Sequence, residues 1–228
     1  MITVFPAKSI ITMNASMPRA EAVAVRDGKI LETGTLESLQ PWLSKHDHKI
    51  DEQFKNSFIV PGLIDPHLHP SMAAVLLPTY FITAMEWKMP WGITPATRSA
   101  VEYDERLKEA LNKPTHGELF ITWGHHNLWH GPISRSRLNS IDSKTPIVVW
   151  NRSFHEVCMN DAALELLEIK EADVENATQI DFKKGRFYEI GLGYAIQKLN
   201  PYILAPEVFR EGLLKLKEVV HFGGQTTI

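Results

Sequence analysis

His67 and His69, one residue apart, are the side chains in this sequence best suited to chemistry. They follow a run of apolar residues, and the whole stretch 58–70 reads as a buried strand. Residues i and i+2 of a strand point to the same side, so both imidazoles can reach one ion. Neutral imidazole is a common ligand of zinc and similar cations. The spacing therefore predicts a metal site at the end of this strand.

A bare His-x-His is a weak signal, but here it is joined to Pro61-Gly62 and to Asp65. Residues 60–69 resemble the first-strand metal motif of the amidohydrolase superfamily, the metal-dependent hydrolases built on a distorted TIM barrel. The resemblance implies that His67 and His69 bind a divalent metal, which we predict to be zinc, at the C-terminal mouth of the barrel. It also implies that Asp65 orients the turn. The alternative is a histidine pair on a solvated strand end.

A further segment resembles the branch of this superfamily that includes N-substituted formamide deformylases. Residues 146–164 match the strand, histidine and Asn-x-x-Ala-Leu helix start of that branch. Residues 185–189 resemble a short Gly-x-x-x-Glu segment of the superfamily. On this resemblance, His155 contacts the substrate or supports groups that do, and Glu189 touches the site. The alternatives are a hydrogen-bonded structural histidine and a carboxylate that faces solvent.

A histidine-rich loop at residues 124–130 follows a strand candidate and resembles the Gly-Trp-Gly-type loop of the same branch. We expect His126 to help form the wall of the substrate pocket. One alternative is a polar loop packed over the barrel rim. Another is that His125 or His126 supplies a third metal ligand. His46, His48 and His116 are expected on the surface.

Composition limits the classes of protein to which the chain can belong. Its 228 residues are 44% hydrophobic and 22% charged, with a net charge of -3, as in a globular chain without a nucleic-acid-binding surface. The single cysteine, Cys158, excludes an internal disulfide framework, fits a reducing compartment and is expected to pack as a small hydrophobe. No stretch approaches the roughly 20 apolar residues of a membrane span. We expect a cytoplasmic protein whose partners are a small-molecule substrate and, as an open option, copies of itself.

The first part of the chain, residues 1–57, reads as short β elements of a small β-sandwich domain. Apolar runs at 9–13, 21–25 and 30–33 predict strands, and Asp27-Gly28 between the last two predicts a tight hairpin. A short helix with Thr35 as its cap is expected at 35–40.

The second part, residues 58–228, changes to an α/β pattern that we interpret as part of a TIM-like (β/α) barrel. Residues 71–98 read as an irregular insertion that contains Trp87 and Trp91, and its aromatic residues either bind a ligand or pack the insertion onto the barrel. The expected barrel strands are 119–124 and 146–150. Helices are expected at 101–111, 160–169 and 206–222. Lys113-Pro114 ends the first of these helices, and Asn160 caps the second.

A complete (β/α)8 barrel takes about 250 residues, and here its first strand begins only near residue 58. About three βα units fit in the remainder, and residues 223–228 read as the start of a further strand. We therefore expect the chain to be the N-terminal part of a longer protein, with an open sheet edge, poor solubility and no activity by itself.

These patterns predict a metal-dependent hydrolase of C–N bonds in amides, formamides or cyclic amides. The catalytic base and the later metal ligands of the superfamily lie on strands that follow, so no catalytic residue is assigned in this chain. Two alternatives stay open, namely a deaminase of the same superfamily, which shares His67 and His69, and a non-catalytic fragment.

Overall fold

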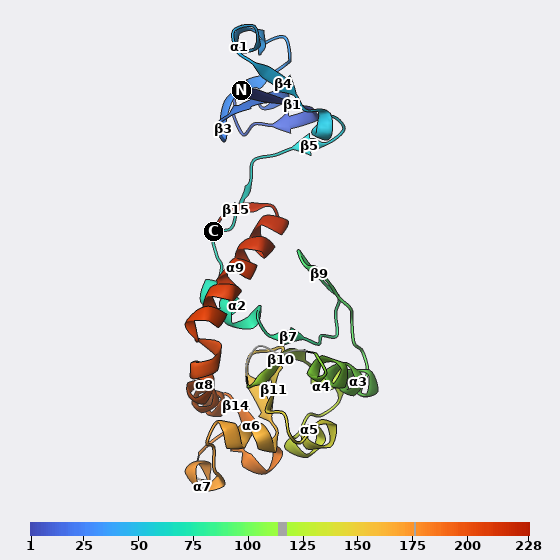
Figure 1. Ribbon diagram of the computed structural model, residues 1–228, viewed down its shortest axis with the longest axis vertical. Coiled ribbons are helices and arrows are strands. Elements are labelled where there is room, and N and C mark those ends of the chain that lie inside the picture. Colours follow the sequence, from blue (N-terminus) through green and yellow to red (C-terminus); the bar gives the residue numbers. More distant parts are fainter. Residues whose placement is uncertain (114–117, 176) are drawn as a thin grey trace. The chain divides into compact units, whose positions relative to one another are not determined.

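The computed structural model describes residues 1–113, 118–175 and 177–228, and Figure 1 shows the course of the chain. Pro114 and His116, which the sequence places at a helix end and on the surface, lie outside these residues. No helix in the described ranges is long and apolar enough to cross a membrane.

The chain forms two compact units, each with a sheet and a core of its own. The first consists of residues 1–65 with 225–228, and the second of residues 66–224. The first unit contains the whole predicted β region and continues to Asp65. That residues 1–57 and 58–228 act as separate domains stays a prediction.

The first unit is built on a five-stranded sheet with the order β3-β2-β1-β4, in which β5 also pairs with β1. Its strands are β1 (Ile2–Ile11), β2 (Arg19–Arg26), β3 (Lys29–Gly34), β4 (His48–Ile50) and β5 (Phe58–Ile59), with a 3-10 turn, η1 (Glu52–Phe54). The first three strands are antiparallel neighbours, whereas β4 and β5 run parallel to β1. This five-stranded sheet is a single layer, so the sandwich stays a prediction. His46 and His48 are exposed, as predicted.

The hairpin between β2 and β3 confirms the turn predicted at Asp27-Gly28. Both residues have positive φ, 52° and 73°, as a two-residue turn with the right-handed twist of its strands requires. The helix predicted at 35–40 is wrong in position, because helix α1 spans Gln40–Leu43. Pro41 lies in its first turn, where a fixed φ favours helix initiation. Thr35 does cap a turn, since its Oγ1 accepts a hydrogen bond of 3.1 Å from the Ser38 N–H.

The stretch predicted as one buried strand at 58–70 instead contains two short strands in different sheets. After β5, strand β6 (Leu63–Ile64) pairs in parallel with β15 (Gln225–Thr227), which confirms the strand expected near the end of the sequence. Leu63 and Ile64 are 54% and 72% exposed, so the prediction of a buried strand is wrong here. The Asp65 N–H extends the pairing by donating to the Thr227 carbonyl at 2.9 Å.

The second unit contains a six-stranded sheet with the order β13-β14-β12-β11-β10-β7. Strands β7, β10 and β11 are parallel to one another, and the others pair antiparallel. The bounds are β7 (Tyr80–Phe81), β10 (Phe120–His125), β11 (Ile147–Asn151), β12 (Glu156–Met159), β13 (Ile180–Asp181) and β14 (Arg186–Tyr188). A separate hairpin joins β8 (Trp87–Met89) to β9 (Gly92–Thr94).

Strands β10 and β11 confirm the strands predicted at 119–124 and 146–150, but they do not continue the sheet of β6. They belong to the six-stranded sheet, whereas β6 pairs with β15. After β11 the chain turns at once into the antiparallel strand β12, so the six-stranded sheet is mixed and is not a run of βα units. The idea that these strands follow β6 as consecutive barrel strands is therefore wrong.

The helices of the second unit cover both faces of its sheet. They are α2 (Pro70–Leu76), α3 (Ala100–Leu111), α4 (Asn127–His130), α5 (Arg135–Ile141), α6 (Asp161–Leu166), α7 (Glu171–Val174), α8 (Ile190–Ile203) and α9 (Pro206–Phe222), with a 3-10 turn, η2 (Phe182–Lys184). The helices predicted at 101–111 and 206–222 are confirmed as α3 and α9. The helix predicted at 160–169 is present as α6 but ends at Leu166, three residues early. The Asn160 cap is confirmed too, because its Oδ1 accepts from the Ala163 N–H at 3.0 Å. The region 71–98 is less irregular than predicted, since it contains α2 and the β8–β9 hairpin.

Successive residues of β11 point to opposite faces of the sheet and enter two cores. Val148 and Trp150 pack against residues of α6 and α8, whereas Ile147 and Val149 pack against residues of α3 and α5. Cys158 lies in the second of these cores, and burial raises the pKa of its thiol to about 12. Cys158 is buried, as predicted. That it is unreactive stays a prediction.

His125 and His130 are wholly buried beside Tyr103, so they are not part of an exposed polar loop. His130 Nδ1 accepts from the His126 N–H at 3.0 Å, and its Nε2 donates to the Thr97 carbonyl at 2.9 Å, which fixes a neutral ring. His125 Nε2 lies 3.1 Å from the Gly131 carbonyl. Burial lowers the pKa of His125 to about 3 and also lowers the pKa of His130.

Helices α2 and α9 pack closely because Gly212 has no side chain. A Cβ atom at Gly212 would lie 1.8 Å from the Ala74 carbonyl oxygen in α2. The backbones approach to a distance that no larger residue permits. Gly193 in α8 offers a contrast, because a Cβ atom there meets nothing within 4 Å.

The buried His125 should make the stability of the second unit depend on pH. In the unfolded chain the pKa of His125 is near 6.5, so below that pH the unfolded state takes up a proton that the folded state does not. The free energy of unfolding should therefore be highest above pH 6.5 and fall by about 2 kcal/mol between pH 7 and 5 from this residue alone. Urea unfolding followed by tryptophan fluorescence should show a smaller fall in His125→Phe. His46→Asn, an exposed control, should keep the wild-type fall, and equal falls in all three proteins would contradict this assignment.

The close approach at Gly212 predicts opposite effects for two glycine-to-alanine changes. Gly212→Ala should lower the free energy of unfolding by about 1–3 kcal/mol, because the added methyl group forces α2 and α9 apart. Gly193→Ala should be neutral or stabilise by up to about 1 kcal/mol, because alanine favours helix and the site is open. Both are measured by thermal and urea unfolding, and a harmless Gly212→Ala would show that the two helices do not pack as described.

Candidate functional site

His67 and His69 lie in an irregular segment between β6 and α2, not on a strand as predicted. The strand ends at Ile64, and prolines flank the histidine pair on both sides. Pro66 has no N–H for a further ladder bond, and Pro70 takes one of the first two positions of α2. His69 is the N-cap residue of that helix, with φ -107° and ψ 77°. The two histidines are therefore positioned by where the helix starts.

The imidazoles of His67 and His69 nevertheless converge, as their spacing predicts. Their Nε2 atoms are 3.2 Å apart, and the ring centroids are 4.9 Å apart with an interplanar angle of 82°. Two nitrogens bound to one tetrahedral zinc ion at about 2.0–2.1 Å lie about 3.3 Å from each other. The separation in this chain is close to that value, so the pair fits two positions in the coordination sphere of a single ion.

The chemistry of the pair depends on which nitrogen carries the proton. A metal ion needs the lone pair of each Nε2, which requires both neutral rings to hold their proton on Nδ1. Both side chains are exposed, so an ion can reach them from solvent. Across the described ranges, no group of three or more His, Cys, Asp or Glu side chains could hold a metal ion. Among the described residues, the pair can therefore offer two nitrogens to an ion, and no cluster of three such side chains forms.

The three residues predicted to contact a substrate, His126, His155 and Glu189, line one hollow of about 580 Å³. His126 is the N-cap of α4 and follows β10, and its Nδ1 accepts from the Leu128 N–H at 3.1 Å. His155 lies in the turn between β11 and β12, and Glu189 lies between β14 and α8. The sheet brings these loops together, because β10, β11, β12 and β14 are consecutive neighbours in it.

His155 and Glu189 contact each other twice. The His155 Nδ1 lies 3.1 Å from a carboxylate oxygen of Glu189, and the Glu189 N–H donates to the His155 carbonyl at 3.0 Å. Glu189 has a φ of 49° and a ψ of -113°, a strained conformation for a residue with a side chain. Both side chains stay more than half exposed, at 66% and 52%. The contact holds the imidazole in place and leaves its Nε2 for a ligand.

Sequence reasoning assigned no role to Arg186 and Tyr188, which also line this hollow. The guanidinium of Arg186 donates to the Glu156 carboxylate at 2.6 Å and lies 4.4 Å from the centre of the Tyr188 ring. The hydrogen bond to Glu156 raises the pKa of Arg186. Their i, i+2 spacing in β14 was the available signal, because it places both side chains on one face of the strand.

Comparison with models of known protein families gives no match. Among curated proteins, the chain is 22% identical over 226 residues to the protein LONG AFTER FAR-RED 3 of Arabidopsis thaliana. This match covers 96% of this chain and 36% of the plant protein. It is 24% identical over 172 residues to the exoenzymes regulatory protein AepA of Pectobacterium carotovorum, covering 73% of this chain and 34% of that protein. The chain therefore spans little more than a third of the length of these relatives.

A shorter match is closer in sequence. Over 48 residues, which are 21% of this chain and 11% of the relative, the chain is 42% identical to the imidazolonepropionase of Pyrobaculum arsenaticum. This match is too short to describe the chain as a whole.

Two solved structures share the fold over the whole of this chain. They are uncharacterized metal-dependent hydrolases from Pyrococcus horikoshii and Pyrococcus furiosus, with TM-scores of 0.70 and 0.72 and identities of 20% and 18%. The chain covers 42% and 43% of them. At such identities the likeness establishes the fold, which is that of a part of these hydrolases.

The ion pair in the hollow should couple more strongly than an ion pair on the open surface. The Glu156 side chain is 13% exposed and that of Arg186 40%, whereas Lys55 and Glu52 are 59% and 63% exposed. Double-mutant cycles with glutamine at both positions should give a coupling of about 1–2 kcal/mol for Arg186–Glu156 and below about 0.5 kcal/mol for Lys55–Glu52. Equal couplings by urea unfolding would show that the hollow does not shield its pair from water.

Proposed function

We propose that this chain is the N-terminal part of a metal-dependent hydrolase that cleaves C–N bonds in amides, formamides or cyclic amides. In this proposal His67 and His69 are two ligands of a divalent metal, which we infer to be zinc. The observation that carries the proposal is the separation of 3.2 Å between the two Nε2 atoms, which suits a shared ion.

The comparisons support this proposal at the level of fold. The two solved neighbours are metal-dependent hydrolases, and the chain covers less than half of each. The short match to an imidazolonepropionase agrees with a hydrolase of this kind. The assignment to the formamide-deformylase-like branch rests on the resemblance of residues 124–130 and 146–164. The choice of amide substrates rests on the resemblance to the amidohydrolase superfamily.

When bound, a divalent metal supplies a Lewis acid that polarises a carbonyl and lowers the pKa of water. The residues of this chain would hold that ion and orient the substrate. His155 is kept in one orientation by Glu189, so its Nε2 can donate to or accept from a polar group of the substrate. His126 lies in the same hollow and offers a second contact from another loop.

A deaminase of the same superfamily is an alternative that uses the same histidine pair. The two reactions differ in their products, because a deaminase releases ammonia and an amide hydrolase releases a carboxylic acid with its amine. A second candidate is a regulatory role without catalysis. The observation that favours it is the name of one relative, the exoenzymes regulatory protein AepA.

Zinc binding by the 228-residue chain tests the metal part of the proposal. Calorimetric titration of the chain should detect one zinc ion per chain, and His67→Asn or His69→Asn should each weaken binding by about tenfold or more, because each removes one of two ligands. His46→Asn, which removes an exposed histidine of the other unit, should leave the affinity unchanged.

Equal zinc affinity in the wild type, His67→Asn and His69→Asn would contradict the metal site.

The catalytic part is tested on the complete protein that carries this chain, loaded with zinc and assayed on N-substituted formamides, amides and cyclic amides. Loss of turnover in His67→Asn supports the hydrolase. A zinc-binding protein that releases only ammonia from an amino-substituted ring would instead support the deaminase.

A further inference from the structure

The contact between His155 and Glu189 is built on two residues with unusual backbone conformations. Glu189 has a φ of 49° and a ψ of -113°, close to the glycine position of a type II′ turn. Phe154, the residue before His155, has a φ of 65°. A glycine adopts such conformations without strain, whereas a residue with a side chain adopts them at a cost. The turns alone therefore do not account for the side chains at these two positions.

The ring of Phe154 fixes the backbone at His155. It packs against two buried tryptophans of neighbouring strands, with centroid distances of 5.4 Å to Trp123 and 6.0 Å to Trp150. The His155 N–H donates to the Ser153 Oγ at 3.2 Å. The imidazole is therefore carried by an ordered turn, although its side chain is exposed.

Hydrogen bonds on both sides of Glu189 fix its backbone as well. The Tyr188 N–H donates to the Gln179 carbonyl at 3.1 Å, and the Ile190 N–H donates to the Gln179 Oε1 at 2.9 Å. The Glu189 N–H itself donates to the His155 carbonyl. Its carboxylate lies 3.1 Å from the His155 Nδ1. The strained conformation thus delivers a carboxylate to the imidazole.

This carboxylate decides which nitrogen of His155 carries the proton. An ionised carboxylate can only accept hydrogen bonds, so the nitrogen that faces it, Nδ1, must be the donor. A neutral imidazole has a single proton on its two ring nitrogens, so its Nε2 is then an acceptor. Neutral His155 therefore offers a lone pair, and not an N–H, to a molecule in the hollow.

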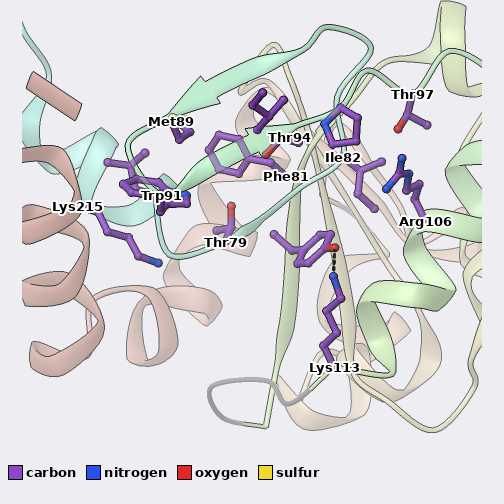
Figure 2. Close-up of a pocket in the computed structure, with 14 residues that line it drawn as sticks. Thr79, Phe81, Ile82, Met89, Trp91, Thr94, Thr97, Arg106, Lys113 and Lys215 are labelled. Atoms are coloured by element: carbon purple, nitrogen blue, oxygen red, sulfur yellow. Dashed lines mark hydrogen bonds between the residues drawn. The ribbon is translucent and has the colours of Figure 1, made fainter. Parts of the chain in front are cut away.

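The hollow around this pair suits a polar ligand, because every described residue of its lining has a polar side chain. The pocket of about 350 Å³ beside the β8–β9 hairpin differs, since Figure 2 shows it lined in part by Phe81, Ile82 and Met89. Among the described residues that line that pocket, none is His, Asp or Glu. The oriented acceptor is thus a feature of the hollow.

We propose that Glu189 is a positioning residue that keeps the proton of neutral His155 on Nδ1, and that the hollow selects amides whose N–H donates to Nε2. This inference rests on the proposed function for the amide class, and it deepens that function. Primary and secondary amides, including N-substituted formamides, meet the acceptor with a donor. Esters and N,N-disubstituted amides have no such donor, so the Nε2 lone pair gains no hydrogen bond from them.

The position of the proton is tested by NMR of the 228-residue chain with isotope-labelled histidine. At about pH 8.5, where free imidazole is neutral, proton–nitrogen correlations within each ring distinguish a protonated nitrogen from an unprotonated one. For His155, identified by the signals that disappear in His155→Gln, we expect the proton on Nδ1. This preference should be lost in Glu189→Ala. Glu86→Ala, which removes an exposed carboxylate elsewhere, should keep it.

Ligand binding tests the selection of an N–H. The chain is titrated with N-methylacetamide or with methyl acetate, which has nearly the same shape but an oxygen in place of the N–H. Saturable shifts of the His155 signals are expected, and the amide should bind about three- to tenfold more tightly than the ester, as one hydrogen bond allows. In Glu189→Ala the amide and the ester should bind equally. Lys113→Gln, in the pocket of Figure 2, is the control and should keep the preference.

Three results would overturn the inference. They are a proton on Nε2 of His155 in the wild type, no saturable binding of N-methylacetamide, and equal binding of the amide and the ester. All three are measured on the wild-type chain, so they do not depend on whether a variant folds.

Failure of the proposed function would look different. A complete protein that hydrolyses no amide, while the chain binds N-methylacetamide selectively at His155, would refute the hydrolase and leave the selection of an N–H standing. Turnover of secondary and N,N-disubstituted amides with equal kcat/KM would refute that selection and leave the hydrolase standing.

Discussion

The candidate metal site depends on the approach of two imidazoles between two prolines. Pro66 and Pro70 prevent the segment from continuing as a strand and start helix α2 one residue after His69. The helix is held in turn by its packing on α9, where Gly212 lets the Ala74 carbonyl come close. The convergence of His67 and His69 is thus tied to the packing of the second unit.

Much of the fold was predictable because its elements carry strong local signals. The apolar runs that became β10 and β11 are buried on both faces, and α9 has a clear apolar stripe. Other elements lack such signals. Strand β1 contains Pro6 at a register shift, and a proline argues against a strand, so its first half is not predicted by the sequence. Helix α8 contains Pro201 and two glycines, which are poor helix formers.

The candidate site was predictable in its residues and less so in its geometry. The His-x-His spacing identified the pair, although a helix start and not a strand brings the rings together. The segments that carry His155 and Glu189 were recognisable, but their contact depends on β12 and β14 pairing antiparallel. Strand β14 has only three residues, which is too short for an alternating pattern to be recognised in the sequence. Pairing between distant strands is not contained in local patterns.

The most direct test of the central claim is a crystal structure of the zinc-loaded chain, with anomalous data on both sides of the zinc absorption edge. We expect one strong anomalous peak about 2.0–2.1 Å from the Nε2 atoms of both His67 and His69. A structure in which zinc binds elsewhere and the two rings keep a direct contact without an ion, or one in which the rings point apart, would contradict it.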